Sequence, residues 1–178
     1  YGNKVITTGE GGMCVSNNKR LVEQMAILRD HGMSTKKKYW HECVGFNYRM
    51  TNLQASIGLA QLERIESILE DRRNIEKIYR KTLSRVRGIE FQKDDFVDRK
   101  KITWLVCVLV HEKRDAVLDL LNRSGIDARP FFYALSEMPI YKSYVHSFKN
   151  SKEISKRGLN LPTNHWLSNH IFDEVEKV

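Results

Sequence analysis

The chain has 178 residues, of which 41% are hydrophobic and 29% charged, a balance typical of a folded globular protein and not of a disordered one. The net charge of +8 raises nucleic acid as a partner, but the basic residues are spread along the chain, and a phosphate-bearing small molecule suits such a surface equally well. The longest apolar run, residues 104–110, is too short to span a membrane, and the three cysteines lack metal-ligand spacing, which indicates reduced thiols in the cytoplasm.

Residues 1–17 place a lysine directly before a Gly-rich turn. Lys4 precedes a β-favouring run at residues 5–8, glycines at 9, 11 and 12 mark the turn, and residues 13–15 are again β-favouring. Glycines allow positive φ angles and a close backbone approach, so the pattern predicts a tight strand–turn–strand unit. Two interpretations of Lys4 stay open. It is either a solvated surface residue, or an amine that the turn holds rigidly and partly desolvates, and Schiff-base chemistry requires an amine of the second kind.

An amphipathic helix is predicted over residues 17–31. Asn17 or Asn18 suits its N-cap, and Gly32 suits the C′ position after its end. Its apolar face is formed by Leu21, Met25 and Leu28. His31 either interacts with the last carbonyl groups of this helix or takes part in a site.

A long loop is predicted over residues 33–46. It is basic at residues 36–38 and aromatic directly afterwards. Loops of this length in a compact domain are usually functional or mobile. Tyr39 and His41 are therefore candidate site residues, while a purely solvated loop stays open for the lysines.

Asn47 and Arg49 precede a second predicted helix. Thr51 and Gln54 have the spacing of a capping box, so the helix begins there and directs its positive end toward the preceding segment. Arg49 adds a planar guanidinium and Asn47 an amide donor, a combination that favours an anion. The residues alone do not decide which of the two makes that contact.

The helical pattern continues to residue 86, which is too long for one straight helix. We expect a break within residues 63–73, core packing of its apolar positions, and a domain boundary near residue 68. The apolar positions are Leu53, Ile57, Ala60, Ile65 and Ile68.

Beyond that boundary the pattern is α+β. The predicted elements are strands at 89–91, 102–110 and 126–129, and a helix at 112–123 ended by Gly125. The second strand is almost continuously apolar, so we expect it to be central and covered on both faces. Arg129 is the last residue of the third strand. It binds either the phosphate or carboxylate group of a ligand, or an acidic side chain in a structural ion pair. Near the chain's end, His165, Trp166 and His170 have no spacing that indicates a metal site.

Six segments resemble the DegT/StrS-type sugar aminotransferases. They are G-N-K-x-I-T-T-G-E-G-G-M from residue 2, L-R-x-H-G from 28, Y-x-H from 39, G-F-N-Y-R-M-T-N-L-Q-A from 45, R-P-F-F-Y from 129 and G-L-N-L-P from 158. The resemblance implies an α/β protein of the pyridoxal phosphate (PLP) transferase fold type I, the aspartate aminotransferase fold. This chain then matches its C-terminal half: residues 1–68 are the last part of the large PLP-binding domain, and residues 69–178 are the small α+β domain.

The resemblance also implies roles for individual residues. Lys4 is the catalytic residue that binds PLP as a Schiff base. Asn47 or Arg49 reaches across a homodimer to the cofactor phosphate of the neighbouring subunit, so that the active sites are shared. Candidate substrate-binding residues are His31, Tyr39, His41, Arg129, Phe131 and Tyr133.

The implied reaction transfers an amino group from glutamate to a nucleotide-linked 4-keto-6-deoxy sugar, a step in making polysaccharides such as O-antigen. R-P-F-F-Y and N-Y-R-M most resemble the GDP-perosamine synthase branch, whereas residues 134–136 depart from the usual Pro-Leu-His and leave the sugar open. We expect the chain alone to be inactive, since an N-terminal half supplies the other cofactor ligands, and we expect neither nucleic acid nor membrane as a partner. Two alternatives are a PLP-binding regulator without turnover and a basic nucleic-acid-binding domain.

Overall fold

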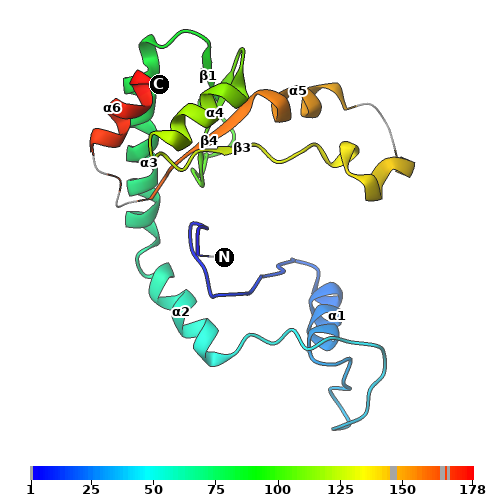
Figure 1. Cartoon of the computed structure of the whole chain (residues 1–178). Helices are drawn as coiled ribbons and strands as arrows, with labels where there is room; N and C mark the ends of the chain where they lie inside the picture. Colours follow the sequence, from blue (N-terminus) through cyan, green and yellow to red (C-terminus); the bar gives the residue numbers. More distant parts are fainter. Residues whose placement is uncertain (1, 145–147, 165–166, 168) are drawn as a thin grey trace. The chain divides into compact units, whose positions relative to one another are not determined.

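The chain forms two compact units. The computed structural model describes residues 2–144, 148–164, 167 and 169–178. Its first unit is Tyr1–Ile65 and its second is Glu66–Val178 (Figure 1). The assignment of residues 1–68 to a cofactor domain and of 69–178 to a small domain stays a prediction.

The first unit contains two helices, α1 (Lys19–Arg29) and α2 (Asn52–Leu62). The predicted strands at 5–8 and 13–15 are wrong, because residues 2–17 contain no strand. Of the three turn glycines only Gly9 has a positive φ, +81°. A strand needs a backbone partner, and here the backbone of Thr7 is hydrogen-bonded by a side chain instead.

Both ends of α1 follow local rules. The N-cap is Asn18, whose side chain accepts a hydrogen bond from the Leu21 N–H at 3.2 Å. At the other end His31 and Gly32 both have positive φ, +60° and +68°, and the Gly32 N–H donates to the Ile27 carbonyl at 2.9 Å. The C′ residue is therefore His31, and the prediction of Gly32 there was wrong by one residue.

The start of α2 and the break after it are confirmed. Thr51 and Gln54 form the capping box, and α2 ends at Leu62 before α3 (Ile65–Thr82) begins. The expected core packing of α2 is wrong, since Leu53 is 73% and Ile57 44% exposed. The physical reason is that the described residues of the first unit form no buried apolar cluster against which α2 could pack: every member of the hydrophobic core cluster of the described residues lies in the second unit.

The second unit is built on a four-stranded antiparallel sheet. Its strand order is β1-β2-β4-β3, with bounds β1 Ile89–Phe91, β2 Val106–Val110, β3 Arg129–Pro130 and β4 Gly158–Leu161. The central position of β2 is confirmed, but residues 102–105 are not part of it. Residues 106, 108 and 110 are buried while 107 and 109 are half-buried, so one face is fully covered and the other in part.

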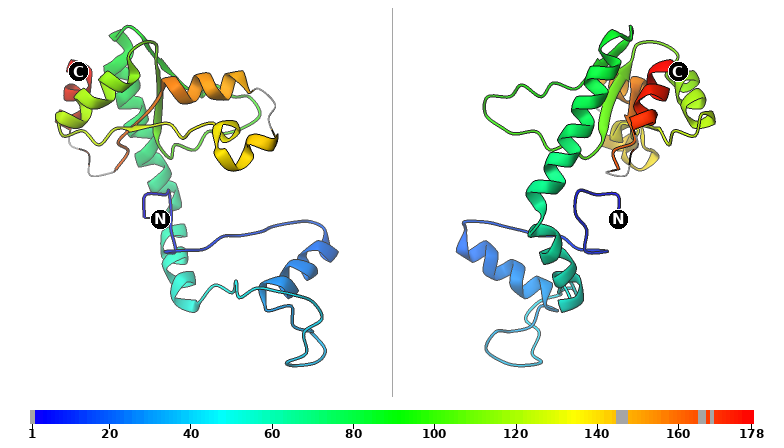
Figure 2. Two further views of the ribbon diagram at one scale, coloured as in Figure 1. Left: turned by 45° about the vertical axis from the view of Figure 1, so that its right-hand side comes forward. Right: turned by 90° about the vertical axis from the view of Figure 1, so that its left-hand side faces the viewer.

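Helices complete this unit and enclose its core. They are α4 (Arg114–Arg123), α5 (Lys149–Arg157) and α6 (Asn169–Lys177), with short 3₁₀ turns at Leu83–Arg85, Leu135–Glu137 and Pro139–Tyr144. Figure 2 shows α3 and α6 side by side next to the sheet. Tyr79 of α3 and Phe172 of α6 meet edge to face at 4.7 Å, and both are buried. None of the described helices has the length and apolar character that a membrane crossing requires.

A buried carboxylate, Glu76 of α3, ties that helix to the segment before β2. It accepts hydrogen bonds from Thr103 Oγ1 at 2.5 Å and from Arg80 at 2.8 and 3.0 Å, and it pairs with Lys101. Its side chain is 7% exposed. Burial alone would raise the pKa of Glu76, but hydrogen bonds from Lys101, Thr103 and Arg80 outweigh burial and hold that pKa below its usual value.

We expect Glu76→Gln to destabilise the protein by about 3 kcal/mol, because removal of this charge leaves Lys101, whose side chain is only 14% exposed, without its counter-charge. Since the folded-state pKa of Glu76 is depressed, its stabilising effect is present above the usual carboxyl pKa and is lost as the pH falls through the folded-state value. Urea unfolding at several pH values between about 7 and about 3 should show a steeper loss of stability in the wild type than in the variant.

The matched control is Glu70→Gln on the same helix. Glu70 is 49% exposed, and its carboxylate lies 3.6 Å from Arg73 and 3.8 Å from Lys77. An exposed pair contributes about 0–1 kcal/mol. Equal losses of stability in the two variants would contradict the role given to Glu76.

Candidate functional site

The segment that follows Lys4 is held on α2 by hydrogen bonds. The Thr7 N–H donates to Gln61 Oε1 at 2.9 Å, and Gln61 Nε2 donates to the Thr7 carbonyl at 2.5 Å. About two turns earlier on α2, Gln54 Nε2 donates to the Glu10 carbonyl at 3.2 Å. The lysine-bearing segment is therefore supported by a helix, and not by a strand pair.

Gly58 of α2 allows this close approach, and Gly11 allows the turn within the segment to be tight. A Cβ atom added at Gly58 would lie 2.9 Å from Thr8 Cγ2, and one added at Gly11 would lie 2.5 Å from Thr8 Oγ1. Real Cβ atoms essentially never approach that closely. Gly58 is therefore required by the packing of residues 7–11 on α2.

Lys4 itself lies on a bend and its side chain is exposed. The partial desolvation expected for it is not provided by the described residues. Its role as the residue that binds PLP stays a prediction.

Asn47 and Arg49 lie at the C-terminal end of α1. The backbone N–H groups of Phe46 and Tyr48 donate to the carbonyl groups of Leu28 and Arg29, at 2.7 and 3.0 Å. Asn47 pairs with Asp30 in an isolated antiparallel bridge. These contacts satisfy carbonyl groups that the helix end would otherwise leave open.

Arg49 has an acidic partner that the sequence analysis missed. Its Nη1 lies 3.5 Å from Oδ1 of Asp30, while its side chain stays 65% exposed. The guanidinium is thus oriented by one carboxylate and still accessible to a further anion. Asp30 lies inside the motif L-R-x-H-G, at its unspecified position.

His31 and His41 are brought together at the same helix end. His41 Nδ1 lies 2.9 Å from the carbonyl oxygen of His31, and because a carbonyl only accepts, the ring carries a proton on Nδ1. The backbones of Gly32 and Gly45 touch, since a Cβ at Gly45 would lie 2.0 Å from the Gly32 nitrogen. This contact fixes the base of the loop, as the Met33–His41 bridge also does.

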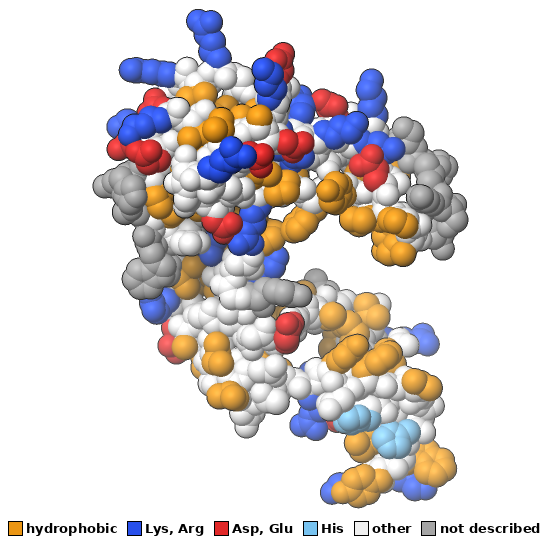
Figure 3. Space-filling model, in the orientation of Figure 1, with side chains coloured by type: hydrophobic (Ala, Val, Ile, Leu, Met, Phe, Trp, Pro, Cys, Tyr) orange, Lys and Arg blue, Asp and Glu red, His pale blue; other side chains and the backbone are white. Residues whose placement is uncertain are grey.

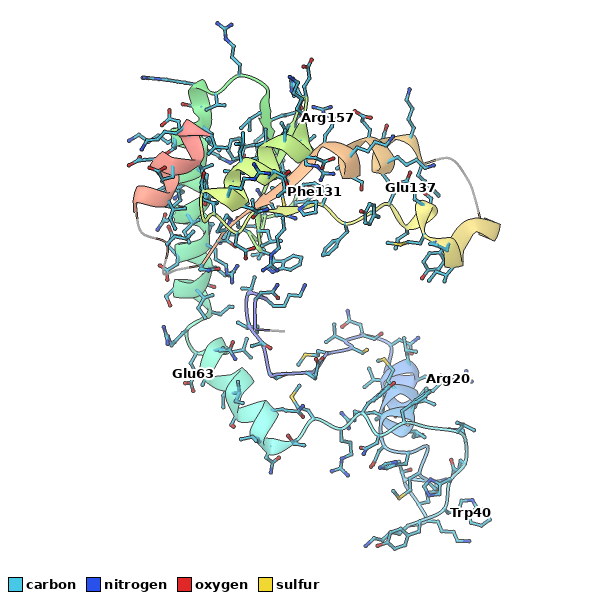
Figure 4. All side chains as sticks on the ribbon, in the orientation of Figure 1. Arg20, Trp40, Glu63, Phe131, Glu137 and Arg157 are labelled. Atoms are coloured by element: carbon cyan, nitrogen blue, oxygen red, sulfur yellow. The ribbon has the colours of Figure 1, made fainter. Side chains whose placement is uncertain are left out.

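The rest of the loop presents aromatic rings to the surface. Tyr39 is 76% exposed and has a positive φ of +61°. The ammonium groups of Lys38 and Lys37 lie over the rings of Tyr39 and Trp40, at 5.0 and 4.0 Å. Figure 4 shows Trp40 at the tip of this loop, and Figure 3 shows hydrophobic side chains distributed over this unit's surface.

Arg129, Phe131 and Tyr133 belong to the second unit. Arg129 makes the ion pair left open by the sequence, with Nη2 2.7 Å from Oδ2 of Asp127, and both side chains are exposed. The ring of Phe131 covers Gly158, where a Cβ would lie 2.1 Å from it (Figure 4). Tyr133 is 75% exposed. Phe131 therefore packs against β4, and substrate contacts by these three residues stay predictions.

Several residues that build the site were not selected from the sequence. Asp30, Gln54, Gly58 and Gln61 all support the candidate residues. A signal was available, because positions 54, 58 and 61 share one face of a helix. The described residues contain no group of three or more His, Cys, Asp or Glu that could hold a metal ion, while His165, Trp166 and the side chain of His170 lie outside the described part.

The first unit contains some of the donor groups that a PLP site requires. Lys4 carries a primary amine, the group that reacts with an aldehyde, and Arg49 and Asn47 carry charged and neutral donors of the kind that bind a phosphate. The start of α2 directs further backbone N–H groups toward the segment that carries Arg49. These residues fit part of a PLP site.

Comparison with known proteins agrees with this chemistry. The profile of the DegT/DnrJ/EryC1/StrS aminotransferase family matches residues 1–178. A GDP-perosamine synthase of Vibrio cholerae is 38% identical over 170 residues, covering 92% of this chain and 46% of that protein. A putative pyridoxal phosphate-dependent aminotransferase, EpsN, of Bacillus subtilis is 31% identical over 184 residues, covering 99% of this chain and 46% of its own length. The chain spans about half the length of the curated relatives it matches.

Solved structures show the same fold. The aminotransferase TlmJ from Streptoalloteichus hindustanus superposes with a TM-score of 0.86 at 25% identity, covering 97% of this chain and 47% of that one. The expected fold class, family and cofactor are thereby confirmed: a partial PLP transferase of fold type I. The chain belongs to the DegT/DnrJ/EryC1/StrS aminotransferase family.

Proposed function

We propose that the protein carrying this chain transfers an amino group from glutamate to a nucleotide-linked 4-keto-6-deoxy sugar, as a PLP-dependent aminotransferase. The observation that carries the proposal is Lys4, an exposed amine next to a segment docked on α2 through Thr7 and Gln61. Support for the sugar comes from the 38% identity to a GDP-perosamine synthase.

The reaction exchanges an amine for a carbonyl oxygen. Glutamate loses its amino group and becomes 2-oxoglutarate, while the sugar's carbonyl carbon becomes an amine-bearing carbon. PLP, when bound, supplies the electron sink for both halves. Lys4 binds the cofactor through its Nζ, and the same Nζ, once released, moves a proton to or from the reacting carbon.

In this proposal, Arg49 and Asn47 bind a phosphate. Asp30 orients the Arg49 guanidinium at 3.5 Å, and the remaining exposure of Arg49 leaves its other N–H groups available. By the family resemblance, that phosphate belongs to the cofactor of a second subunit in a homodimer. A cytoplasmic location also belongs to the proposal, and it rests on three free cysteines.

We expect the full-length protein, supplied with PLP and glutamate, to release 2-oxoglutarate continuously only when a suitable ketosugar is present, because without the sugar the release stops once the bound cofactor has taken up the amino group. The substrates to compare are GDP-, dTDP- and UDP-linked 4-keto-6-deoxy sugars, with the amino sugar identified by mass spectrometry. Residues 1–178 expressed alone should give no sustained release, because the described residues of the first unit contribute nothing to the hydrophobic core cluster and provide only part of a PLP site.

Two outcomes would overturn this proposal. If the full-length protein binds PLP but converts none of these sugars, a regulator without turnover becomes the better account. Sustained release by residues 1–178 alone would show that a complete site lies within this chain.

A further inference from the structure

One carboxamide of α2 engages both backbone groups of Thr7. Gln61 Oε1 accepts the Thr7 N–H at 2.9 Å, while Gln61 Nε2 donates to the Thr7 carbonyl at 2.5 Å and to the Ile57 carbonyl at 2.8 Å. Carbonyls accept only, so these contacts determine which end of the amide is oxygen. Gln61 thus takes the place of the neighbouring strand that residues 5–8 lack.

The same helix face holds the next residues as well. Thr8 lies against Gly58, and the Glu10 carbonyl accepts from Gln54 Nε2 at 3.2 Å. Within the turn, Thr8 Oγ1 donates to the Glu10 carbonyl at 2.8 Å and the Gly9 N–H donates to Thr7 Oγ1 at 3.1 Å. Among these contacts, the one between Gln61 and Thr7 lies nearest to Lys4 in sequence. It also fixes both backbone groups of Thr7, the N–H and the carbonyl.

We propose that Gln61 is the positioning residue of Lys4. Gln61 fixes the backbone of Thr7, three residues after Lys4. It thereby restricts the position of the Lys4 main chain, and hence the region that the Lys4 Nζ can reach. A misplacement of about 1 Å can cost about 100-fold in rate. This inference rests on the proposed function, in which Lys4 binds the cofactor.

The first test measures the Thr7 amide directly, in the cofactor-free full-length protein, by hydrogen–deuterium exchange corrected for intrinsic rates. Gln61→Met removes both hydrogen bonds and should speed exchange at Thr7 about tenfold or more. The control is the same change at Gln24, an exposed glutamine of α1, which should leave exchange at Thr7 unchanged. Unchanged exchange in Gln61→Met would overturn the proposal.

A second variant keeps the shape of the side chain. In Gln61→Glu the carboxylate still accepts from the Thr7 N–H but cannot donate to the Thr7 carbonyl. A protonated carboxyl group can do both, so protection of Thr7 should return as the pH is lowered through the carboxyl pKa. Gln24→Glu should show no such recovery. If protection in Gln61→Glu does not depend on pH, the two-point contact is wrong.

The last arm links this contact to Lys4. In the PLP-loaded full-length protein, Gln61→Met should lower kcat about 10- to 100-fold while KM for glutamate changes little, and Gln61→Glu should be intermediate. Rapid exchange at Thr7 with unchanged kcat would show a contact without a positioning role and would overturn the inference. If borohydride fixes no cofactor on Lys4 in the wild type, the proposed function fails and this inference falls with it, whereas the exchange data still report separately whether Gln61 holds Thr7.

Discussion

Lys4→Ala is expected to lower turnover of the full-length protein by about 10⁴-fold or more, because it removes both the covalent attachment point and the proton carrier. The fold should be unaffected. Lys4 is exposed, and the contacts that dock its segment on α2 are made by Thr7, Thr8 and Glu10. Circular dichroism and thermal unfolding that match the wild type would verify this part of the expectation.

Chemical labelling identifies the lysine independently of rate. Borohydride reduction of the PLP-loaded protein should leave the cofactor on Lys4, and peptide mapping should find it on no other lysine. The matched control is Lys36→Ala, in the exposed loop, which should keep both turnover and the label on Lys4. Label on residues 36–38 in the wild type would refute the assignment.

We further expect two inactive variants to restore activity when they share a dimer. In the proposed homodimer, a Lys4→Ala subunit still offers Arg49 to its neighbour, and an Arg49→Ala subunit still offers Lys4. A mixed dimer then contains one site with both defects and one site with neither. Random pairing makes half of the dimers mixed, so unfolding the two variants and refolding them together should recover about a quarter of wild-type activity.

The control mixture combines two variants with the same defect, Lys4→Ala and Lys4→Gln, and should recover nothing. Asn47→Ala should be paired with Lys4→Ala in the same way, because Asn47 pairs with Asp30 through the backbone and Arg49 through its side chain, and neither contact decides which of the two binds the phosphate. Inactivity of a verified mixed dimer would mean that each subunit builds its site from its own residues, and the shared site would be wrong.

The sequence by itself determined those features that depend on residues close together in the chain. Asn18 caps α1 and the Thr51–Gln54 box opens α2, since each cap joins residues three apart. Gly125, with a φ of +79°, follows the end of α4 as expected. The family motif around Lys4 was readable for the same reason, because its twelve positions are contiguous.

Only the tertiary structure decided what each segment packs against. Residues 5–8 favour strand, yet no strand lies beside them, and the backbone hydrogen bonds of Thr7 go to the side chain of Gln61, 54 residues away. Apolar spacing on α2 indicated a buried face, but spacing does not say whether a covering surface exists, and Leu53 is exposed. Phe131 belongs to the R-P-F-F-Y motif, and only the structure shows that its ring fills the space left by the missing side chain of Gly158. In each case the residue that decides the packing is distant in sequence. A local pattern can indicate which face of an element is apolar, but it does not identify the residues that pack against that face.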